Sequence, residues 1–175
     1  MRLQRLGEHV CVPWRNGLGT TLEVAVGPFI DPTDPNSWRW RVSLATVRAD
    51  GPFSTFANVD RTLIVVDGEG MQLVVGRVQR SALPYHPVVF PGDESTAATL
   101  LGGPVRDLNV MVRRDFATAS VEIVNAADVE RADIVFALGE ATVGPFLLDR
   151  FDAVLGIDHH VITRGHLAII RIDLP

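Results

Sequence analysis

Residues 105–114, VRDLNVMVRR, alternate between two kinds of side chain. One face carries Leu108, Val110 and Val112, and the other carries Asp107, Asn109, Met111 and Arg113. A period of two predicts a β-strand with one apolar face. The polar face of such a strand usually meets water. In a closed barrel it can instead point into a cavity, where an asparagine offers both a donor and an acceptor and an arginine can fork onto a carboxylate.

The same alternation recurs on both sides of this stretch. Residues 21–26, TLEVAV, and 38–47, WRWRVSLATV, alternate in the same way, and the second of these places Arg41 and Ser43 on one face. Residues 61–75, RTLIVVDGEGMQLVV, predict a hairpin whose turn spans 67–70. Further strands are predicted at SVEIV, DIVFAL, DAVLGI and HLAIIRI.

Turns rich in Gly and Pro separate these runs, which predicts an all-β sandwich or barrel. The signals DPTDPNS, DGP, FPGD and LGGP are all too short to be linkers. Gly-Pro-Phe followed by a spacer, an Asp and an apolar run begins at Gly51 and again at Gly144. This faint repeat hints at two linked halves.

Composition narrows the class of protein. A length of 175 residues suits one domain or two small ones that share a core. A net charge of -5 gives no electrostatic footprint for nucleic acid. All 16 basic residues are Arg, so a Schiff-base lysine and a P-loop lysine are excluded. The sequence has no apolar run of about 20 residues and no secretory h-region, so we expect no membrane association. A single cysteine, Cys11, cannot form an internal disulfide, which predicts a reducing compartment, the cytoplasm. We expect Cys11 to be a small buried apolar residue.

The stretch PWRNGLGTT, residues 13–21, combines turn residues with side chains able to hold a ligand. Backbone N–H groups in a glycine-rich turn can approach an anion. The stretch lacks the following helix and the Lys-Ser/Thr pair of phosphate-binding loops, so nucleotide binding is not expected. The alternative is a tight turn on which Trp14 packs as a lid.

Metal and nucleophile motifs are missing from the sequence. The five histidines are His9, His86, His159, His160 and His166. None of them forms a His-x-His pair followed by a carboxylate, and there is no second cysteine, so we expect no metal site. No G-x-S-x-G elbow marks a serine-type triad.

Three segments together resemble the HutD/Ves family of cupin-fold proteins. They are PWRNGLGTTLEV, WRWRVSLATVRADGPFSTFANVDRTLIVVDGEGMQL and LLGGPVRDLNVMVRR, and they cover most of residues 13–114. The chain departs from the family pattern where Arg15 and Leu18 replace a Lys and a Gly. Leu18 disfavours a positive φ, so the turn is expected to differ locally. The segment in the place of the first cupin motif lacks that motif's histidine pair.

The resemblance implies a bicupin, with two small antiparallel β-barrels of jelly-roll type in one compact chain. Residues 1–114 would form the first barrel, with possible strand exchange from the C-terminal part, and 115–175 a degenerate second barrel. It also implies a role in histidine utilisation as a binding or regulatory component, without an established catalytic activity, metal or cofactor, and with a possible homodimer.

Read together, the inward faces and the opening loop predict one polar cavity in the first barrel. The predicted ligand-binding residues are Trp14, Asn16, Thr21, Glu23, Arg41, Ser43, Arg61, Asp107, Asn109, Met111 and Arg113. Several arginines with few acids suit a small carboxylate, such as urocanate or a formylglutamate-like acid. The first hypothesis is therefore an anion-binding module. The alternative is a metal-free isomerase or hydrolase of a small acid, with Glu23 or Asp107 as general base and Arg61 or Arg113 stabilising charge.

Overall fold

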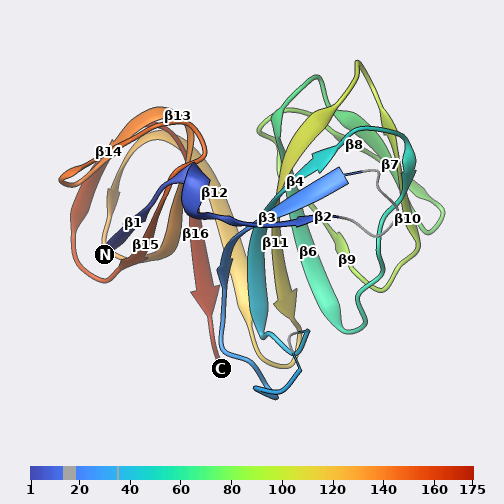
Figure 1. Ribbon diagram of the computed structural model, residues 1–175, viewed down its shortest axis with the longest axis horizontal. Coiled ribbons are helices and arrows are strands. Elements are labelled where there is room, and N and C mark those ends of the chain that lie inside the picture. The colour runs from blue at the N-terminus through green and yellow to red at the C-terminus, as the bar shows by residue number, and fades with distance from the viewer. Residues whose placement is uncertain (14–18, 35) are drawn as a thin grey trace. The chain divides into compact units, whose positions relative to one another are not determined.

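The computed structural model describes residues 1–13, 19–34 and 36–175. Strands dominate this part of the chain, and one short 3-10 helix, η1, spans Leu6–Glu8 (Figure 1). The predicted all-β class is confirmed. The strands are β1 (Arg2–Gln4), β2 (Val10–Pro13), β3 (Gly19–Val26), β4 (Trp40–Val47), β5 (Gly51–Pro52), β6 (Val59–Asp67), β7 (Met71–Val75), β8 (Val78–Ala82), β9 (Val88–Pro91), β10 (Thr96–Leu100), β11 (Val105–Arg113), β12 (Thr118–Val129), β13 (Ala132–Val143), β14 (Phe146–Leu148), β15 (Ala153–Ile157) and β16 (Val161–Asp173).

The strands form two compact units. The first unit is Val10–Thr118, and the second unit is Met1–His9 together with Ala119–Leu174. The first nine residues, which the sequence groups with the N-terminal half, therefore lie in the second unit. The reason is strand pairing, because β1 runs antiparallel to β15 with Leu3 opposite Val154.

Two antiparallel sheets build the first unit. The larger has the order β2-β3-β4-β11-β6-β9 and the smaller has the order β5-β10-β7-β8. Apolar side chains from both sheets fill the space between them, which gives the unit its core. These are Val47, Leu63, Val65, Phe90 and Val105 from the larger sheet, and Met71, Leu73, Val75, Ala82 and Ala98 from the smaller one. Within the described residues both sheets are open, each with two edge strands.

The predicted hairpin over 61–75 is wrong. Both strands form, but β6 pairs with β11 and β9, whereas β7 pairs with β10 and β8 in the other sheet. The turn between them contains Gly68 and Gly70, with φ of 91° and 112°, which is backbone that glycine adopts without a steric penalty. The turn carries the chain from one sheet to the other, so that Leu63 and Leu73 contribute to one core.

The second unit is a single antiparallel sheet with the order β1-β15-β13-β16-β12, in which β14 also pairs with β13. The long pair β13–β16 contains a register shift between Ala137 and Ala141. Small and aliphatic side chains, among them Val135, Leu167 and Ile169, fill its core.

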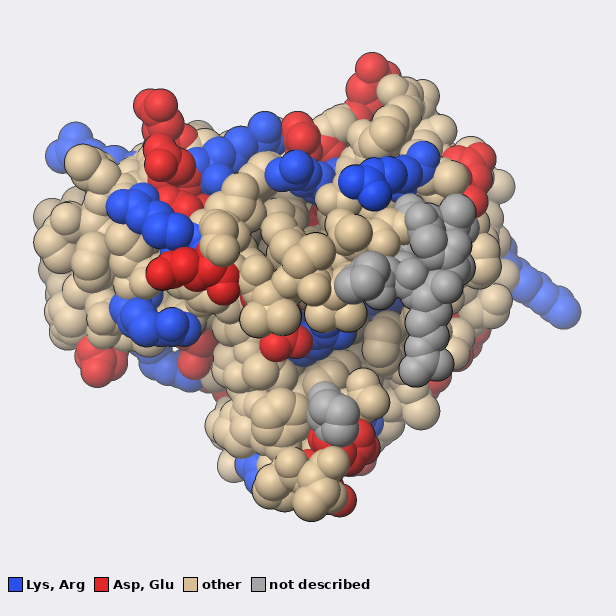
Figure 2. Space-filling model, viewed as in Figure 1, with Lys and Arg blue, Asp and Glu red and all other residues tan. Residues whose placement is uncertain are grey.

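None of the helices that the structure describes has the length and apolar character needed to cross a bilayer. Acidic and basic side chains are interspersed over the face shown in Figure 2.

Candidate functional site

The register of three neighbouring strands creates a polar inner face in the first unit. Met111 of β11 lies opposite Arg41 of β4 on one side and Arg61 of β6 on the other. Two residues back along β11, Asn109 lies opposite Ser43 and Leu63, and Asp107 then lies opposite Ala45 and Val65. Because side chains alternate between faces of a sheet, all of these point to the same side. Beyond Asp107, the same face continues into the apolar core at Val105 and Val47.

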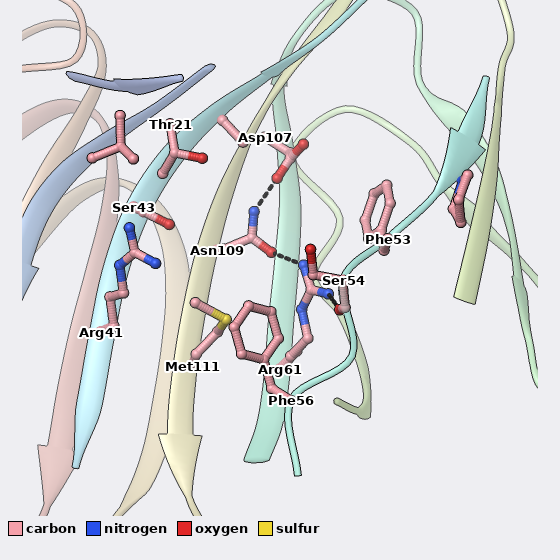
Figure 3. A pocket seen from close by; sticks show the side chains of 13 residues that line it. Thr21, Arg41, Ser43, Phe53, Ser54, Phe56, Arg61, Asp107, Asn109 and Met111 are labelled. Atoms are coloured by element: carbon pink, nitrogen blue, oxygen red, sulfur yellow. Dashed lines mark hydrogen bonds between the residues drawn. The ribbon is translucent and has the colours of Figure 1, made fainter. Parts of the chain in front are cut away.

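This polar face borders a cavity of about 550 Å³. The cavity lies within the first unit and receives side chains from β2, β3, β4, β5, β6 and β11 and from the segment after β5 (Figure 3). Its lining residues are Val12, Thr21, Arg41, Ser43, Ala45, Pro52, Phe53, Ser54, Phe56, Arg61, Asp107, Asn109 and Met111.

Arg61 is the more deeply buried of the two arginines that line the cavity, with 6% of its surface exposed. Its Nη2 donates a hydrogen bond of 2.7 Å to Asn109 Oδ1, and its Nη1 donates one of 3.5 Å to the Ser54 carbonyl. Its guanidinium carbon lies 5.1 Å from the ring centroids of Phe53 and Phe90. Burial lowers the pKa of Arg61 to about 10, with the Asp107 charge acting in the opposite direction, so the group stays positive near neutral pH.

Asn109 joins Arg61 to a buried carboxyl group. It accepts from Arg61 and donates through Nδ2 to Asp107 Oδ1, so the amide orients both groups (Figure 3). Asp107 is 1% exposed. Desolvation raises the pKa of the Asp107 carboxyl to about 7, although the Arg61 charge and the Asn109 hydrogen bond act to lower it. Asp107 is therefore only partly ionised at neutral pH.

Two polar atoms at this end of the cavity have no hydrogen-bond partner among the described residues. They are Arg61 Nε and Asp107 Oδ2, and both are buried. An unpaired buried donor or acceptor carries a free-energy penalty of about 1–3 kcal/mol. Two such atoms beside one cavity indicate a place where a polar ligand gains hydrogen bonds that the protein itself does not supply.

The opposite side of the cavity carries a paired charge. Arg41 Nε lies 3.1 Å from Glu23 Oε2, with Arg41 on β4 and Glu23 on β3. Both side chains are partly exposed, so the pair contributes modestly to stability. Its two charges compensate each other, which leaves Arg61 as the cation of the cavity that lacks an ion-pair contact within the described residues.

The structure brings most of the sequence-predicted site residues together. Those that line the cavity are Thr21, Arg41, Ser43, Arg61, Asp107, Asn109 and Met111. Glu23 is not a lining residue and reaches the site through Arg41. Trp14 and Asn16, together with the departures at Arg15 and Leu18, lie outside the described residues.

Arg113 has a different position from the one predicted. Its Nε donates to the Trp38 carbonyl at 3.0 Å and its Nη2 to the Asn36 carbonyl at 2.8 Å. Its guanidinium also lies over the Trp38 ring, 5.2 Å from the centroid. Arg113 is the last residue of β11, so its side chain holds neighbouring loop carbonyls and is not among the cavity-lining groups.

Sequence reasoning missed the segment that covers Arg61. Phe53, Ser54 and Phe56 follow β5 and line the cavity, although they follow no strand alternation. The signal that could have found them is the GPFSTF stretch just before β6, because aromatic side chains close to an arginine in sequence can form cation–π contacts with it. Val12, Ala45 and Pro52 were also missed.

The donor set of the cavity favours an anion over a metal. Within the described ranges, no group of three or more His, Cys, Asp and Glu side chains is placed to hold a metal ion. The site instead offers a buried guanidinium with an unused N–H, a carboxyl group with a raised pKa, and an amide that orients both. Guanidinium groups bind carboxylates by charge-assisted hydrogen bonds.

Two curated proteins are similar to this chain in sequence. A curated relative from Pseudomonas putida, described as an uncharacterized 21.2 kDa protein in the hutC 3' region, is 36% identical over 114 residues, which cover 63% of this chain and 57% of that protein. The aligned part thus spans little more than half of that relative's length. Protein Ves from Citrobacter koseri is 32% identical over 133 residues, 73% of this chain and 68% of the relative.

A solved structure and a family model extend the match to nearly the whole chain. The structure of HutD from Pseudomonas fluorescens SBW25, obtained in a formate condition, superimposes with a TM-score of 0.87 at 29% identity, covering 99% of this chain and 98% of that one. The model of the HutD family matches residues 7–169. The chain therefore belongs to the HutD family.

Proposed function

We propose that this protein binds a small carboxylate in the cavity of the first unit and serves histidine utilisation as an accessory or regulatory component. The observation that carries the proposal is the unused hydrogen-bonding capacity of buried Arg61 within a cavity of about 550 Å³. A guanidinium held in place by Asn109 and three phenyl rings is already oriented for an anion. Little ordering entropy is then lost on binding.

The rest of the cavity suggests the shape of the ligand. Met111 and Phe56 provide apolar surface beside Arg61, while Thr21, Ser43 and Arg41 provide polar groups across the cavity. An acid with one carboxylate at Arg61 and a planar or polar tail toward Ser43 fits this distribution. Urocanate and N-formylglutamate both have this form, and the hutC location of the Pseudomonas putida relative supports choosing acids of histidine breakdown.

Calorimetric titration with urocanate, N-formylglutamate and formate tests the proposal. We expect saturable binding of at least one acid. Arg61→Gln removes the charge and keeps an amide donor, so affinity should fall by about 10- to 150-fold, which corresponds to about 1.5–3 kcal/mol for a charge-assisted hydrogen bond.

Arg80→Ala is the matched control, because Arg80 is exposed on β8 and is not a lining residue of the cavity. This variant should bind like the wild type. Equal affinities of wild type and Arg61→Gln would contradict the proposal.

A second candidate function is a metal-free isomerase or hydrolase of the same acid. The raised pKa of Asp107 beside Arg61 favours it, since a group with a pKa near neutrality suits general acid–base chemistry. Glu23 is a weaker candidate for the base because it pairs with Arg41 and does not line the cavity. NMR spectra of the acid recovered after titration separate the two functions, because they distinguish isomers as well as hydrolysis products: an unchanged acid supports binding alone, and a converted acid supports catalysis.

We also infer a bicupin organisation in the cytoplasm, with pairing into a homodimer. In this proposal the ligand-bearing barrel of jelly-roll type, predicted over residues 1–114, corresponds to the first unit, Val10–Thr118, and the degenerate barrel, predicted over 115–175, corresponds to the second unit, which also includes residues 1–9. The two facing sheets around one core in the first unit support the first barrel, and the separate apolar core of the second unit supports a second barrel. Cys11 is exposed, so its predicted burial is wrong. As the single cysteine of the chain it still supports a reducing compartment.

A further inference from the structure

The unexplained group in this cavity is the carboxyl of Asp107. Its Oδ1 accepts from Asn109, but its Oδ2 is buried with no partner among the described residues. A buried carboxylate normally accepts several hydrogen bonds or pairs directly with a cation. Asp107 does neither, although Arg61 lines the same cavity.

Asn109 explains how the two charges are kept apart. Its side-chain oxygen faces Arg61 and its side-chain nitrogen faces Asp107 (Figure 3). The amide therefore fills the position in which a direct ion pair would form. Arg61 keeps an unused Nε–H, and Asp107 keeps an unused oxygen.

We propose that the cavity binds its carboxylate together with one proton, which comes from solvent and resides on Asp107 Oδ2. This inference rests on the proposed function and adds its regulation. With Asp107 ionised, an incoming anion meets a buried negative charge that already compensates Arg61. With Asp107 protonated, Arg61 is the uncompensated cation, and the new O–H of Asp107 can donate a hydrogen bond to the ligand.

Among the residues that the structure describes, few charged groups surround Asp107. Arg61 on β6 is the charge that acts on it. On the other strands that face the cavity, Arg41 of β4 pairs with Glu23 of β3, and the lining residues of β2 and β5 are Val12 and Pro52. The protonation of Asp107 is therefore governed by burial, Arg61 and the ligand.

The consequence is a pH-dependent affinity. Burial places the pKa of the Asp107 carboxyl at about 7. Well below this pH the group is already protonated, so anion binding takes up no proton and affinity is constant. Above it, each anion bound takes up one proton, and affinity falls by about tenfold per pH unit. Arg61, with a pKa of about 10, remains charged over most of this range.

Titration calorimetry with N-formylglutamate tests the coupling, because the carboxyls of this probe, with ordinary pKa values of about 4, are ionised from about pH 5.5 upward. In buffers of different ionisation enthalpy, we expect proton uptake close to zero at about pH 5.5 and close to one at about pH 8.5. This measurement uses the wild-type protein and does not depend on any variant.

Two variants locate the proton. Asp107→Asn places an amide where the protonated carboxyl stood, so its affinity should no longer fall between about pH 7 and pH 9. Asp60→Asn is the control, because Asp60 is a half-exposed carboxylate on β6 that pairs with Arg114 and does not line the cavity, and it should keep the wild-type slope.

Each outcome has a distinct meaning. Saturable wild-type binding with a flat affinity over this range overturns the inference and leaves the proposed function standing. The wild-type slope in Asp107→Asn also overturns it, because the proton then resides elsewhere. An absence of saturable binding of N-formylglutamate, urocanate and formate at every pH overturns both proposals.

Discussion

Asp107 and Arg61 are opposite charges that the fold buries close together without a direct contact. Asn109 satisfies one atom of each, and three phenyl rings surround the guanidinium. A buried charge without full hydrogen bonding lowers stability, and proteins tolerate such groups mainly at functional sites. At the scale of the residue, the site is thus a locally destabilised arrangement within an otherwise apolar core.

The first prediction at this scale concerns stability against pH. In the unfolded chain Asp107 has its ordinary pKa of 3.8, and in the native state the pKa is about 7. The native state therefore binds more protons between these values, so the free energy of unfolding falls as pH rises from about 4 to about 7 and is not changed further by this group above that. The total drop is at most about 4 kcal/mol, from about 1.4 kcal/mol for each pKa unit.

Asp107→Asn should remove this drop. Urea denaturation should find the variant more stable than the wild type at about pH 8, with the difference shrinking toward about pH 5. The comparison of variant with wild type cancels the titration of other groups. A variant that is less stable at the higher pH, relative to the wild type, would show that the ionised carboxylate is favoured in the native state.

At the scale of the element, β11 was predictable from its sequence and its environment was only partly so. Strict alternation located the strand and assigned Asp107, Asn109 and Met111 to one face, which the structure shows lining the cavity. Alternation fails at the end of a strand, where Arg113 turns to loop carbonyls. The sequence also did not predict which strands pair with one another. The β6–β7 turn is an example, because the turn residues do not determine which sheet the following strand joins.

A prediction at this scale concerns the bulge between β13 and β16. Gly165 has a φ of +100°, and a Cβ there would lie 2.5 Å from the Glu140 carbonyl oxygen. Gly165→Ala should therefore lower the free energy of unfolding by about 2–4 kcal/mol, from backbone strain together with overpacking. Gly139→Ala is the control, because a Cβ at Gly139 meets nothing within 4 Å. Equal losses in chemical denaturation would contradict this account.

At the scale of the whole molecule, the second unit combines the first nine residues with residues from the last third of the chain. Residues 1–9 supply β1 to the sheet of the second unit before the chain builds the first unit and returns. The sequence could not reveal this, because β1 is only three residues long and carries no alternation strong enough to name a partner. The cavity-lining residues, in contrast, come entirely from the first unit.

Asp152 fixes the N-terminal segment within the second unit. Its substitution tests whether the cavity of the first unit works independently of the second unit. Its carboxylate is 2% exposed, and it accepts from the backbone N–H of Leu6 at 2.8 Å and of Asp149 at 2.9 Å, as well as from Arg5. Asp152→Ala leaves both N–H groups without this acceptor, so the free energy of unfolding should fall by about 2–4 kcal/mol. The affinity of the native variant for N-formylglutamate should stay at the wild-type value, because Asp152 contributes nothing to the cavity lining.

Asp158→Ala is the control, since that carboxylate is 85% exposed, and its denaturation curve should match the wild type. A loss of affinity in Asp152→Ala under conditions where the protein is fully folded would show that the second unit takes part in ligand binding.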